Sequence, residues 1–173
     1  TLYLKDRPFG LLRDVLAVFG RHPVAAARIA SRAAASGGHD GRRVLRRLAH
    51  FAQGARVARV ASANNVSHLH AHFGLAPATI AWLASQIMSL RGRPVGFSFT
   101  IHGFHDFVDP AEARLDLKAR FAKAVVCVSD FTRSQLCLNT SPDLWPRFHV
   151  LRCGVDLGKF PLRPKLDRSE SAT

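Results

Sequence analysis

The sequence of 173 residues lacks any apolar run that approaches the roughly 20 residues needed to span a bilayer. Its start, Thr1-Leu-Tyr-Leu-Lys-Asp6, has neither an initiator methionine nor the charged-then-apolar layout of a secretory signal peptide. No membrane-spanning segment is therefore predicted. Because the start is typical of the middle of a longer protein, we expect a fragment.

Cysteine is also scarce. The three cysteines, Cys127, Cys137 and Cys153, are odd in number, and their spacing matches neither a zinc site nor a CxxC pair. No Walker loop, GxSxG elbow or dinucleotide GxGxxG occurs. The aromatic ladder with basic residues that single-stranded nucleic-acid binders use is missing as well. The expected compartment is the reducing cytosol.

Acidic residues are few, since 25 Lys and Arg face 12 Asp and Glu, for a formal net charge of +13. Such an excess favours nucleic acid, phosphate-bearing substrates or an acidic membrane surface as partners. A composition rich in arginine and alanine can equally reflect a GC-rich genome. Hydrophobic residues make up 47% of the chain, which is enough for one globular domain with a core.

Three helices are predicted before the first strand, over residues 8–20, 23–35 and about 42–63. Apolar residues at helical spacing predict one buried face for the first helix: Leu11, Leu12, Val15, Leu16 and Phe19. A second stripe is predicted to be buried in the third helix: Leu45, Leu48, Ala52 and Ala55. Four arginines of the third helix fall off that stripe: Arg42, Arg43, Arg46 and Arg47.

Strands and helices then alternate along the chain. The predicted strands cover residues 66–70, 94–100, 124–128 and 148–152. Helices are predicted between them: 76–90, one that starts at Asp109-Pro110-Ala111-Glu112 and reaches Phe121, and 131–138. This alternation predicts an α/β fold, a parallel sheet with right-handed crossovers and helices on both faces. We expect one domain over 1–162 and a linker or tail over 163–173.

Two of these strands lead into histidines. His68, His70 and His72 alternate along the first strand and share one face, and His102 follows the second strand, just before Gly103. Ligands of open parallel sheets bind outside the carboxyl ends of the strands, so these histidines lie where such a fold does its chemistry. Metal ligation, a structural role and the lining of a polar cleft all stay open, although no nearby Cys, Asp or Glu completes a zinc site.

Other residues near the same edge have two interpretations each. Gly74 permits a tight turn before a helix whose N-terminus could bind an anion. Asp106 could orient a histidine or bind a sugar hydroxyl. Ser129 could face the edge or cap the following helix, and Arg152 could face a phosphate or lie on the surface.

Four segments occur in a familiar order and spacing: His-Leu-His-Ala-His-Phe-Gly (68–74), Ser-Phe-Thr-Ile-His-Gly (98–103), Val-Val-Cys-Val-Ser-Asp-Phe-Thr-Arg-Ser-Gln-Leu (125–136) and His-Val-Leu-Arg-Cys-Gly-Val-Asp (149–156), then Phe160. Together they resemble the N-terminal domain of retaining family-4 glycosyltransferases of the GT-B fold, of the exopolysaccharide and colanic-acid type. The resemblance covers about residues 66–162. The family's first strand with its glycine-rich loop, and its donor-binding C-terminal domain, have no counterpart in this sequence.

The resemblance implies a Rossmann-like, acceptor-side domain of a hexosyltransferase-type enzyme. It implies that His102 is catalytic and that seven residues bind substrate: His72, Gly74, Thr100, Gly103, Asp106, Ser129 and Arg152. It also implies no metal and no cofactor beyond a nucleotide-sugar co-substrate. The acceptor would be a saccharide or lipid-linked, and the chain alone would be inactive.

Partners and location follow from the same resemblance. We expect a cytoplasmic protein without a nucleic-acid partner, and we hypothesise peripheral contact of the Arg-rich third helix with an anionic membrane. Two alternatives stay open: a non-catalytic Rossmann-like binding domain, and a nucleic-acid-binding module suggested by charge alone.

Overall fold

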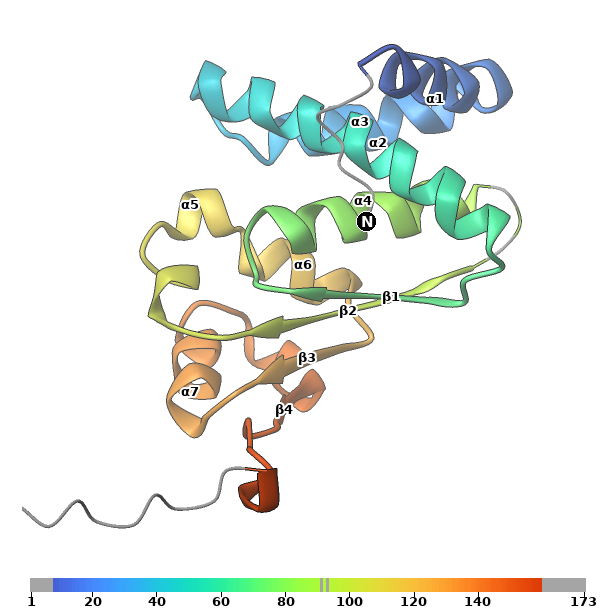
Figure 1. Ribbon diagram of the computed structural model, residues 1–173. Helices are drawn as coiled ribbons and strands as arrows, with labels where there is room; N and C mark the ends of the chain where they lie inside the picture. Colours follow the sequence, from blue (N-terminus) through green and yellow to red (C-terminus); the bar gives the residue numbers. More distant parts are fainter. Residues whose placement is uncertain (1–7, 91, 93, 160–173) are drawn as a thin grey trace, which may run out of the picture.

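The computed structural model describes residues 8–90, 92 and 94–159 (Figure 1). Three helices come first: α1 (Pro8–Arg21), α2 (Pro23–Ala35) and α3 (Gly41–Ala63). The sheet and its connections follow: β1 (His68–His72), α4 (Ala76–Ser89), β2 (Gly96–Ile101), the 3-10 turn η2 (Phe104–Asp106), α5 (Pro110–Ala113), α6 (Leu115–Phe121), β3 (Ala124–Cys127), α7 (Asp130–Leu138), η3 (Pro142–Arg147), β4 (Phe148–Val150) and η4 (Leu157–Lys159). The tail predicted for 163–173, and Phe160, lie outside the described residues.

The four strands are parallel and follow one another in the order β1-β2-β3-β4. The fold class predicted from the sequence, an α/β Rossmann-like sheet flanked by helices, is confirmed. One face of the sheet is apolar: Leu69, Ala71, Phe97, Phe99, Ile101, Val125, Cys127, Phe148 and Val150. The other face is mostly polar or small: His68, His70, His72, Gly96, Ser98, Thr100, Ala124, Val126 and His149.

The connecting helices of the described chain cover the apolar face only, which differs from the expected cover on both faces. α4 packs on β1 and β2, α6 packs on α4, and α7 packs on β3 and β4. The strand order explains this, because right-handed crossovers that always step in the same direction place every connecting helix on the same face. The histidine-bearing face therefore has no helix of the described residues over it (Figure 1).

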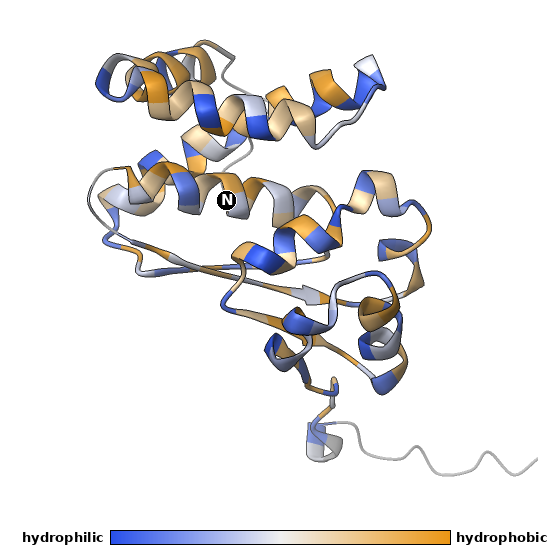
Figure 2. Ribbon diagram, turned by 180° about the vertical axis from the view of Figure 1, so that it is seen from behind, coloured by the Kyte–Doolittle hydropathy of each residue, from blue (hydrophilic) through white to orange (hydrophobic). Residues whose placement is uncertain are grey.

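The core lies between the apolar face of the sheet and α4 (Figure 2). Trp82, Leu83 and Ile87 of α4 are buried, as are the stacked rings of Phe97 and Phe99 on β2. α3 packs on α4, and α1 and α2 pack on α3, so these three helices form an outer layer. Within the described part, no helix has both the length and the apolar character to cross a membrane.

Two predicted boundaries need correction. β1 covers His68–His72 instead of 66–70, so His72 belongs to the strand. The helix predicted from Asp109 to Phe121 is broken into α5 and α6 at Arg114, whose φ of 42° lies in the left-handed region. The break turns the chain between Glu112, which faces α3, and Lys118, which faces the end of β1.

The predicted buried stripes of α1 and α3 are partly wrong. In α1, Leu12 and Leu16 are exposed, whereas Asp14 is buried. In α3, Leu45 is 71% exposed and Arg47 only 2% exposed, the reverse of the expectation. The reason is that the first half of α3 faces acidic groups of α5 instead of an apolar surface.

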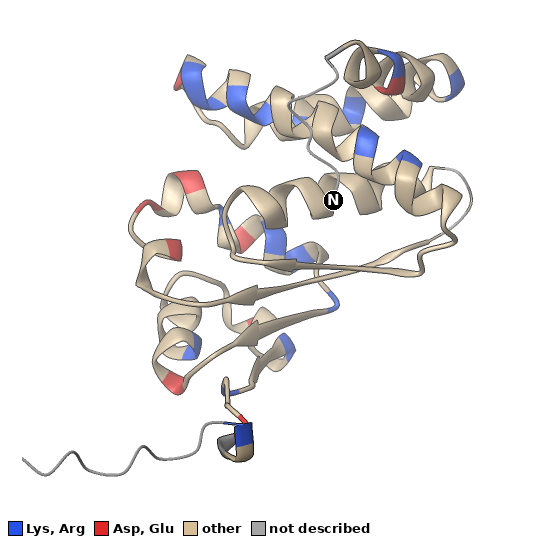
Figure 3. Cartoon of the chain, viewed as in Figure 1, with Lys and Arg blue, Asp and Glu red and all other residues tan. Residues whose placement is uncertain are grey.

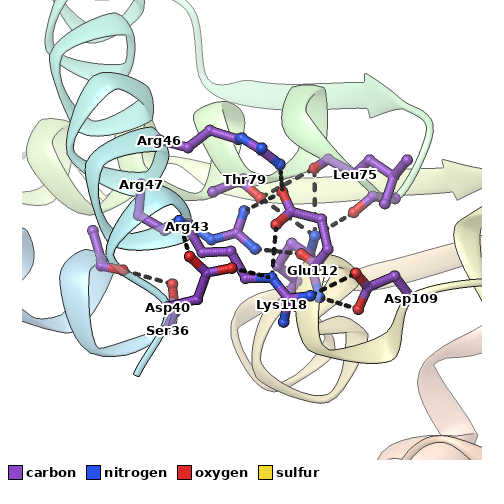
Figure 4. A network of polar contacts seen from close by, with 12 residues as sticks. Ser36, Asp40, Arg43, Arg46, Arg47, Leu75, Thr79, Asp109, Glu112 and Lys118 are labelled. Atoms are coloured by element: carbon purple, nitrogen blue, oxygen red, sulfur yellow. Dashed lines mark hydrogen bonds and ion pairs between the residues drawn. The ribbon is translucent and has the colours of Figure 1, made fainter. Parts of the chain in front are cut away.

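Figure 3 shows basic residues at the start of α3 and acidic residues at α5, and a network of ion pairs joins the two helices (Figure 4). One carboxylate oxygen of Glu112 lies 3.2 Å from Arg46 Nη1 and 3.6 Å from Arg47 Nη1. Arg43 donates to Asp109 at 2.8 Å, and the buried Arg47 also donates to the Glu112 carbonyl. Burial lowers the pKa of Arg47, and the Glu112 carboxylate opposes that effect.

A second buried contact joins α6 to the segment that follows β1. Lys118 is 1% exposed, and its Nζ donates to the carbonyls of Gly74 and Leu75 and to Thr79 Oγ1. On the other side, Gly74 N donates to Asp106 Oδ1 at 2.9 Å. Burial, followed by the charge of Arg47, lowers the pKa of Lys118 to about 7. Gly74 is thus held between a buried lysine and a buried aspartate.

Replacing Glu112 tests the first of these contacts. Glu112→Gln leaves the buried guanidinium of Arg47 without its carboxylate, so we expect a loss of about 3–5 kcal/mol in the free energy of unfolding. Urea denaturation followed by circular dichroism measures it. As a matched control, Asp116→Asn breaks the half-exposed pair of Arg114 and Asp116 and costs under about 1 kcal/mol. Equal losses in the two variants would contradict the structural role of Glu112.

Replacing Lys118 tests the second contact through its pH dependence. The pKa of Lys118 in the folded chain, about 7, is below its ordinary value of 10.5. The unfolded chain therefore binds more protons between these values, and stability rises with pH there, by up to about 1.4 kcal/mol per pH unit. Lys118→Met removes this rise in urea denaturation between neutral and alkaline pH, whereas Lys123→Met, at an exposed lysine, retains it. If the unfolding free energy of Lys118→Met rises with pH as steeply as that of the wild type, the lowered pKa of Lys118 is not the cause of the rise.

Candidate functional site

The candidate site lies at the carboxyl ends of β1 and β2. His72 ends β1, and its Nδ1 is 2.8 Å from Nε2 of His102, which follows β2. Between β1 and α4, Phe73 takes a left-handed φ of 74° and places its ring 4.8 Å from that of His102. His102 is half-buried and His72 exposed, so both rings are close to the surface where a ligand can reach them.

A row of histidines continues from this pair along β1, on the polar face of the sheet. The hydroxyl of Ser98 is hydrogen-bonded to His68 Nε2 and to His70 Nδ1, each at 2.7 Å. His70 Nε2 bonds Thr100 Oγ1 at 2.9 Å, and the His70 ring lies 5.2 Å from that of His72. The predicted shared face of these histidines is confirmed, and the partners of His68 and His70 are hydroxyls of the neighbouring strand β2.

The surroundings of His70 shift its pKa. Burial lowers its pKa below the ordinary value, and the charges of His72, His68 and His102 lower it further. A neutral imidazole has one donor and one acceptor nitrogen, which suits its position between the hydroxyls of Ser98 and Thr100. At neutral pH the His70 ring is therefore uncharged, and both of its nitrogens are hydrogen-bonded.

The hydrogen bonds divide the histidines into two groups: His68 and His70 bond strand hydroxyls, as a structural role requires, whereas His72 and His102 pair with each other at the edge of the sheet. Among the described residues, no group of three or more His, Cys, Asp and Glu side chains is arranged to hold a metal ion. The ring nitrogens of His68, His70, His72 and His102 instead bond hydroxyls or one another.

Gly74 and Asp106 are buried residues next to the histidine pair, and they are hydrogen-bonded to each other. The left-handed residue of this turn is Phe73, so the turn does not require Gly74 for its φ. A Cβ at Gly74 would lie 2.7 Å from Leu115 Cδ2 and 3.3 Å from Asp106 Oδ1, so the side chain of Leu115 would have to shift to make room for it. Asp106 is fully buried, and its hydrogen-bond partner is Gly74 N instead of a histidine or the surface.

Three further predicted residues lie on the same edge with other partners. Ser129 caps α7: its hydroxyl accepts from Thr132 N at 3.2 Å, as the capping interpretation predicted. Arg152, exposed after β4, pairs with Asp130. Gly103 has an extended φ of −173°, which any residue can adopt. The structure therefore groups His72, Thr100, His102 and Gly103 near one another, and it places Ser129 and Arg152 farther along the edge.

Sequence reasoning missed two residues that shape this site. Lys118 lies three residues after the buried Leu115 and one before the buried Ala119, so its position on an apolar face was the available signal. Phe73 follows β1 directly, and a phenylalanine gives no sequence signal for a left-handed backbone.

A hollow of about 420 Å³ lies next to this region, on the helix side of the sheet. Its lining comes from η2, α5, α6 and the end of α7, and includes Asp106, Arg114 and Asn139. None of the histidines lines it. The candidate site is thus the open sheet edge around His72 and His102.

One protein family matches the sequence. The match to Glycosyltransferase Family 4 covers residues 14–159, which is most of the chain and contains the whole candidate site. No curated protein and no solved structure gave a match. The matched range starts in α1 and ends in η4, so it includes every strand of the sheet together with the histidines of β1 and His102. The chain belongs to Glycosyltransferase Family 4, as an N-terminal domain of the GT-B type.

Proposed function

We propose that this domain forms the acceptor side of a retaining, hexosyltransferase-type glycosyltransferase. The observation that carries the proposal is the pair of His72 and His102, joined at 2.8 Å where two parallel strands end. Family membership supplies the reaction class, and the pair supplies polar groups at the edge where α/β folds bind ligands.

In the proposed reaction, the bond between the anomeric carbon of the sugar and the leaving diphosphate oxygen breaks. A bond from that carbon to an acceptor oxygen forms on the same face, and the acceptor proton passes to the leaving diphosphate. His102 is the proposed catalytic residue of this chain: its Nε2 is engaged by His72, and its Nδ1 is the ring nitrogen that would bond a substrate hydroxyl or phosphate. His72 and Phe73 hold the ring of His102 in place.

Six further residues belong to the proposed substrate-binding edge, either in contact with substrate or by positioning a neighbour: Gly74, Thr100, Gly103, Asp106, Ser129 and Arg152. Asp106 acts through Gly74, and Thr100 acts through His70. Arg152 is the exposed cation of this edge and suits a phosphate, in exchange for its partner Asp130.

The proposed co-substrate is a nucleotide-sugar, and the proposed acceptor is a saccharide or a lipid-linked saccharide of surface polysaccharide biosynthesis. No metal or other cofactor enters the scheme. We place the enzyme in the cytoplasm, with peripheral contact at the inner face of the membrane. Nucleic acid is left out because three of the four arginines at the start of α3, Arg43, Arg46 and Arg47, already pair with Asp109 or Glu112.

His102→Ala tests the proposal in the complete enzyme, that is, this domain together with the donor-binding domain that the scheme requires. Loss of one preorganised hydrogen bond to the reacting groups lowers kcat by about 100-fold. Transfer of labelled sugar from nucleotide-sugars to lipid-linked and free saccharide acceptors measures it.

His149→Ala is the matched control, since His149 is exposed on the same face of the sheet but on β4, at the opposite edge from β1. It should keep the wild-type kcat. A His102→Ala enzyme with wild-type kcat contradicts the role of His102.

A further inference from the structure

A carboxylate with one unpartnered oxygen lies beside the hollow of about 420 Å³ on the helix side of the sheet. The carboxylate belongs to Asp106, which lines the hollow and is fully buried. Its Oδ1 accepts from Gly74 N at 2.9 Å, whereas its Oδ2 has no hydrogen-bond partner among the described residues. A buried oxygen without a donor costs free energy, so Oδ2 is an acceptor that a ligand in the hollow can satisfy.

The cations near this carboxylate are engaged by other groups. Lys118 attracts Asp106 electrostatically, but its Nζ donates to two carbonyls and a hydroxyl on the other side of α6. The guanidinium of Arg114, which also lines the hollow, forms two hydrogen bonds of 3.0 Å to Asp116. Within the described part of the chain, neither cation donates a hydrogen bond to Asp106 Oδ2.

The remaining lining of the hollow defines the shape and charge of a ligand. Phe107, Pro110 and Leu115 contribute apolar surface. The charged side chains of the lining are two carboxylates and one guanidinium, so the hollow has an excess of negative charge although the chain has a formal net charge of +13. Apolar walls with a few placed polar groups are typical of small-molecule sites.

We propose that the hollow binds a small molecule with an apolar body and a primary ammonium group, which donates to Asp106 Oδ2. Hydrogen bonds between charged partners are about twice as strong as those between neutral ones, which favours an ammonium over a hydroxyl. An anionic ligand is disfavoured because it would meet the carboxylate of Asp106.

The position of the hollow gives its ligand a route to the histidine pair. The lining includes Ala111 of α5 and Leu115 of α6, which lie on the two sides of the break at Arg114. Asp106 extends this contact to Gly74, which follows the left-handed Phe73. An ammonium at Asp106 therefore contacts the group that holds this turn from the helix side of the sheet. A regulatory effect on sugar transfer rests on the proposed function, whereas binding does not.

Nuclear magnetic resonance of the full chain labelled with 15N tests the binding, with cyclohexylammonium as the probe and cyclohexanol and cyclohexanecarboxylate as probes with the same ring. We expect cyclohexylammonium to shift the backbone amide signals of Gly74, Ala111 and Leu115, with a dissociation constant on the order of 1 mM. Cyclohexanol binds about tenfold more weakly, and cyclohexanecarboxylate does not shift these signals.

Two variants place the probe in the hollow. Asp106→Asn keeps an oxygen for Gly74 N but replaces Oδ2 by an NH2 donor, and it lowers the affinity about tenfold or more. Ala111→Leu, at an exposed position of the lining, fills part of the hollow without touching the buried core and lowers the affinity about fivefold or more. The second variant decides the question if Asp106→Asn does not fold.

Three controls leave the hollow unchanged and retain wild-type affinity. Asp143→Asn removes an exposed carboxylate of η3, Ala27→Leu enlarges an exposed alanine of α2, and His72→Ala removes one ring of the histidine pair. Wild-type affinity in both Asp106→Asn and Ala111→Leu overturns the proposal, as does equal binding of cyclohexylammonium and cyclohexanol. Loss of binding in His72→Ala also overturns it, because the probe would then bind at the histidines.

Probe binding is measured without sugar transfer, so the two proposals fail separately. A chain that binds cyclohexylammonium in the hollow but transfers no sugar as part of the complete enzyme contradicts only the proposed function. An enzyme that transfers sugar through His102 while its hollow binds no ammonium contradicts only the ammonium site.

Discussion

Gly74 is the point on which the site depends, because buried groups hold it from two sides. Its N–H donates to the carboxylate of Asp106, and its carbonyl accepts from Lys118. These contacts fix the turn that carries Phe73 in a left-handed conformation and hold His72 opposite His102. A lysine with 1% exposure costs free energy unless its donors are satisfied, so the chain supplies three acceptors around Nζ. The same interaction that stabilises α6 on α4 therefore also aligns the histidines.

The polar face of the sheet follows from strand order as much as from composition. Four parallel neighbours joined by crossovers in one direction leave one face without a connecting helix. Sheets of this kind are ordinarily covered on both faces by apolar contacts. Here the uncovered face carries histidines bonded to Ser98 and Thr100, which satisfies the polar groups within the face itself. The lowered pKa of His70 fits this arrangement, since burial disfavours a charged ring, and the neighbouring histidines lower the pKa further.

The sequence predicted the parallel sheet and the shared face of His68, His70 and His72, because period-two alternation and the capping residues are local signals. It failed for the faces of α1 and α3. Helical spacing shows which residues lie together, but the identity of the opposing surface decides whether leucines or arginines face inward. Arg47 is buried because Glu112, far away in the sequence, meets it. No local pattern contains that pairing, and the same holds for Lys118 and Gly74.

The net charge of +13 does not show that the arginines of α3 pair with two separate sets of acidic residues. At its start, α3 directs arginines at the carboxylates of α5, and midway it directs Arg56 and Arg59 at the buried Asp14 of α1. A buried ion pair fixes the position of a helix along its axis relative to its neighbour, because a shift along the axis would leave a buried charge unpaired. α3 is therefore joined electrostatically to both the outer helix α1 and the helices next to the site. Leucines such as Leu45 face water on α3 because the inward positions are taken by these charges. The exposed apolar residues of the outer layer thus follow from an electrostatic constraint on α3, not from a defect in the core.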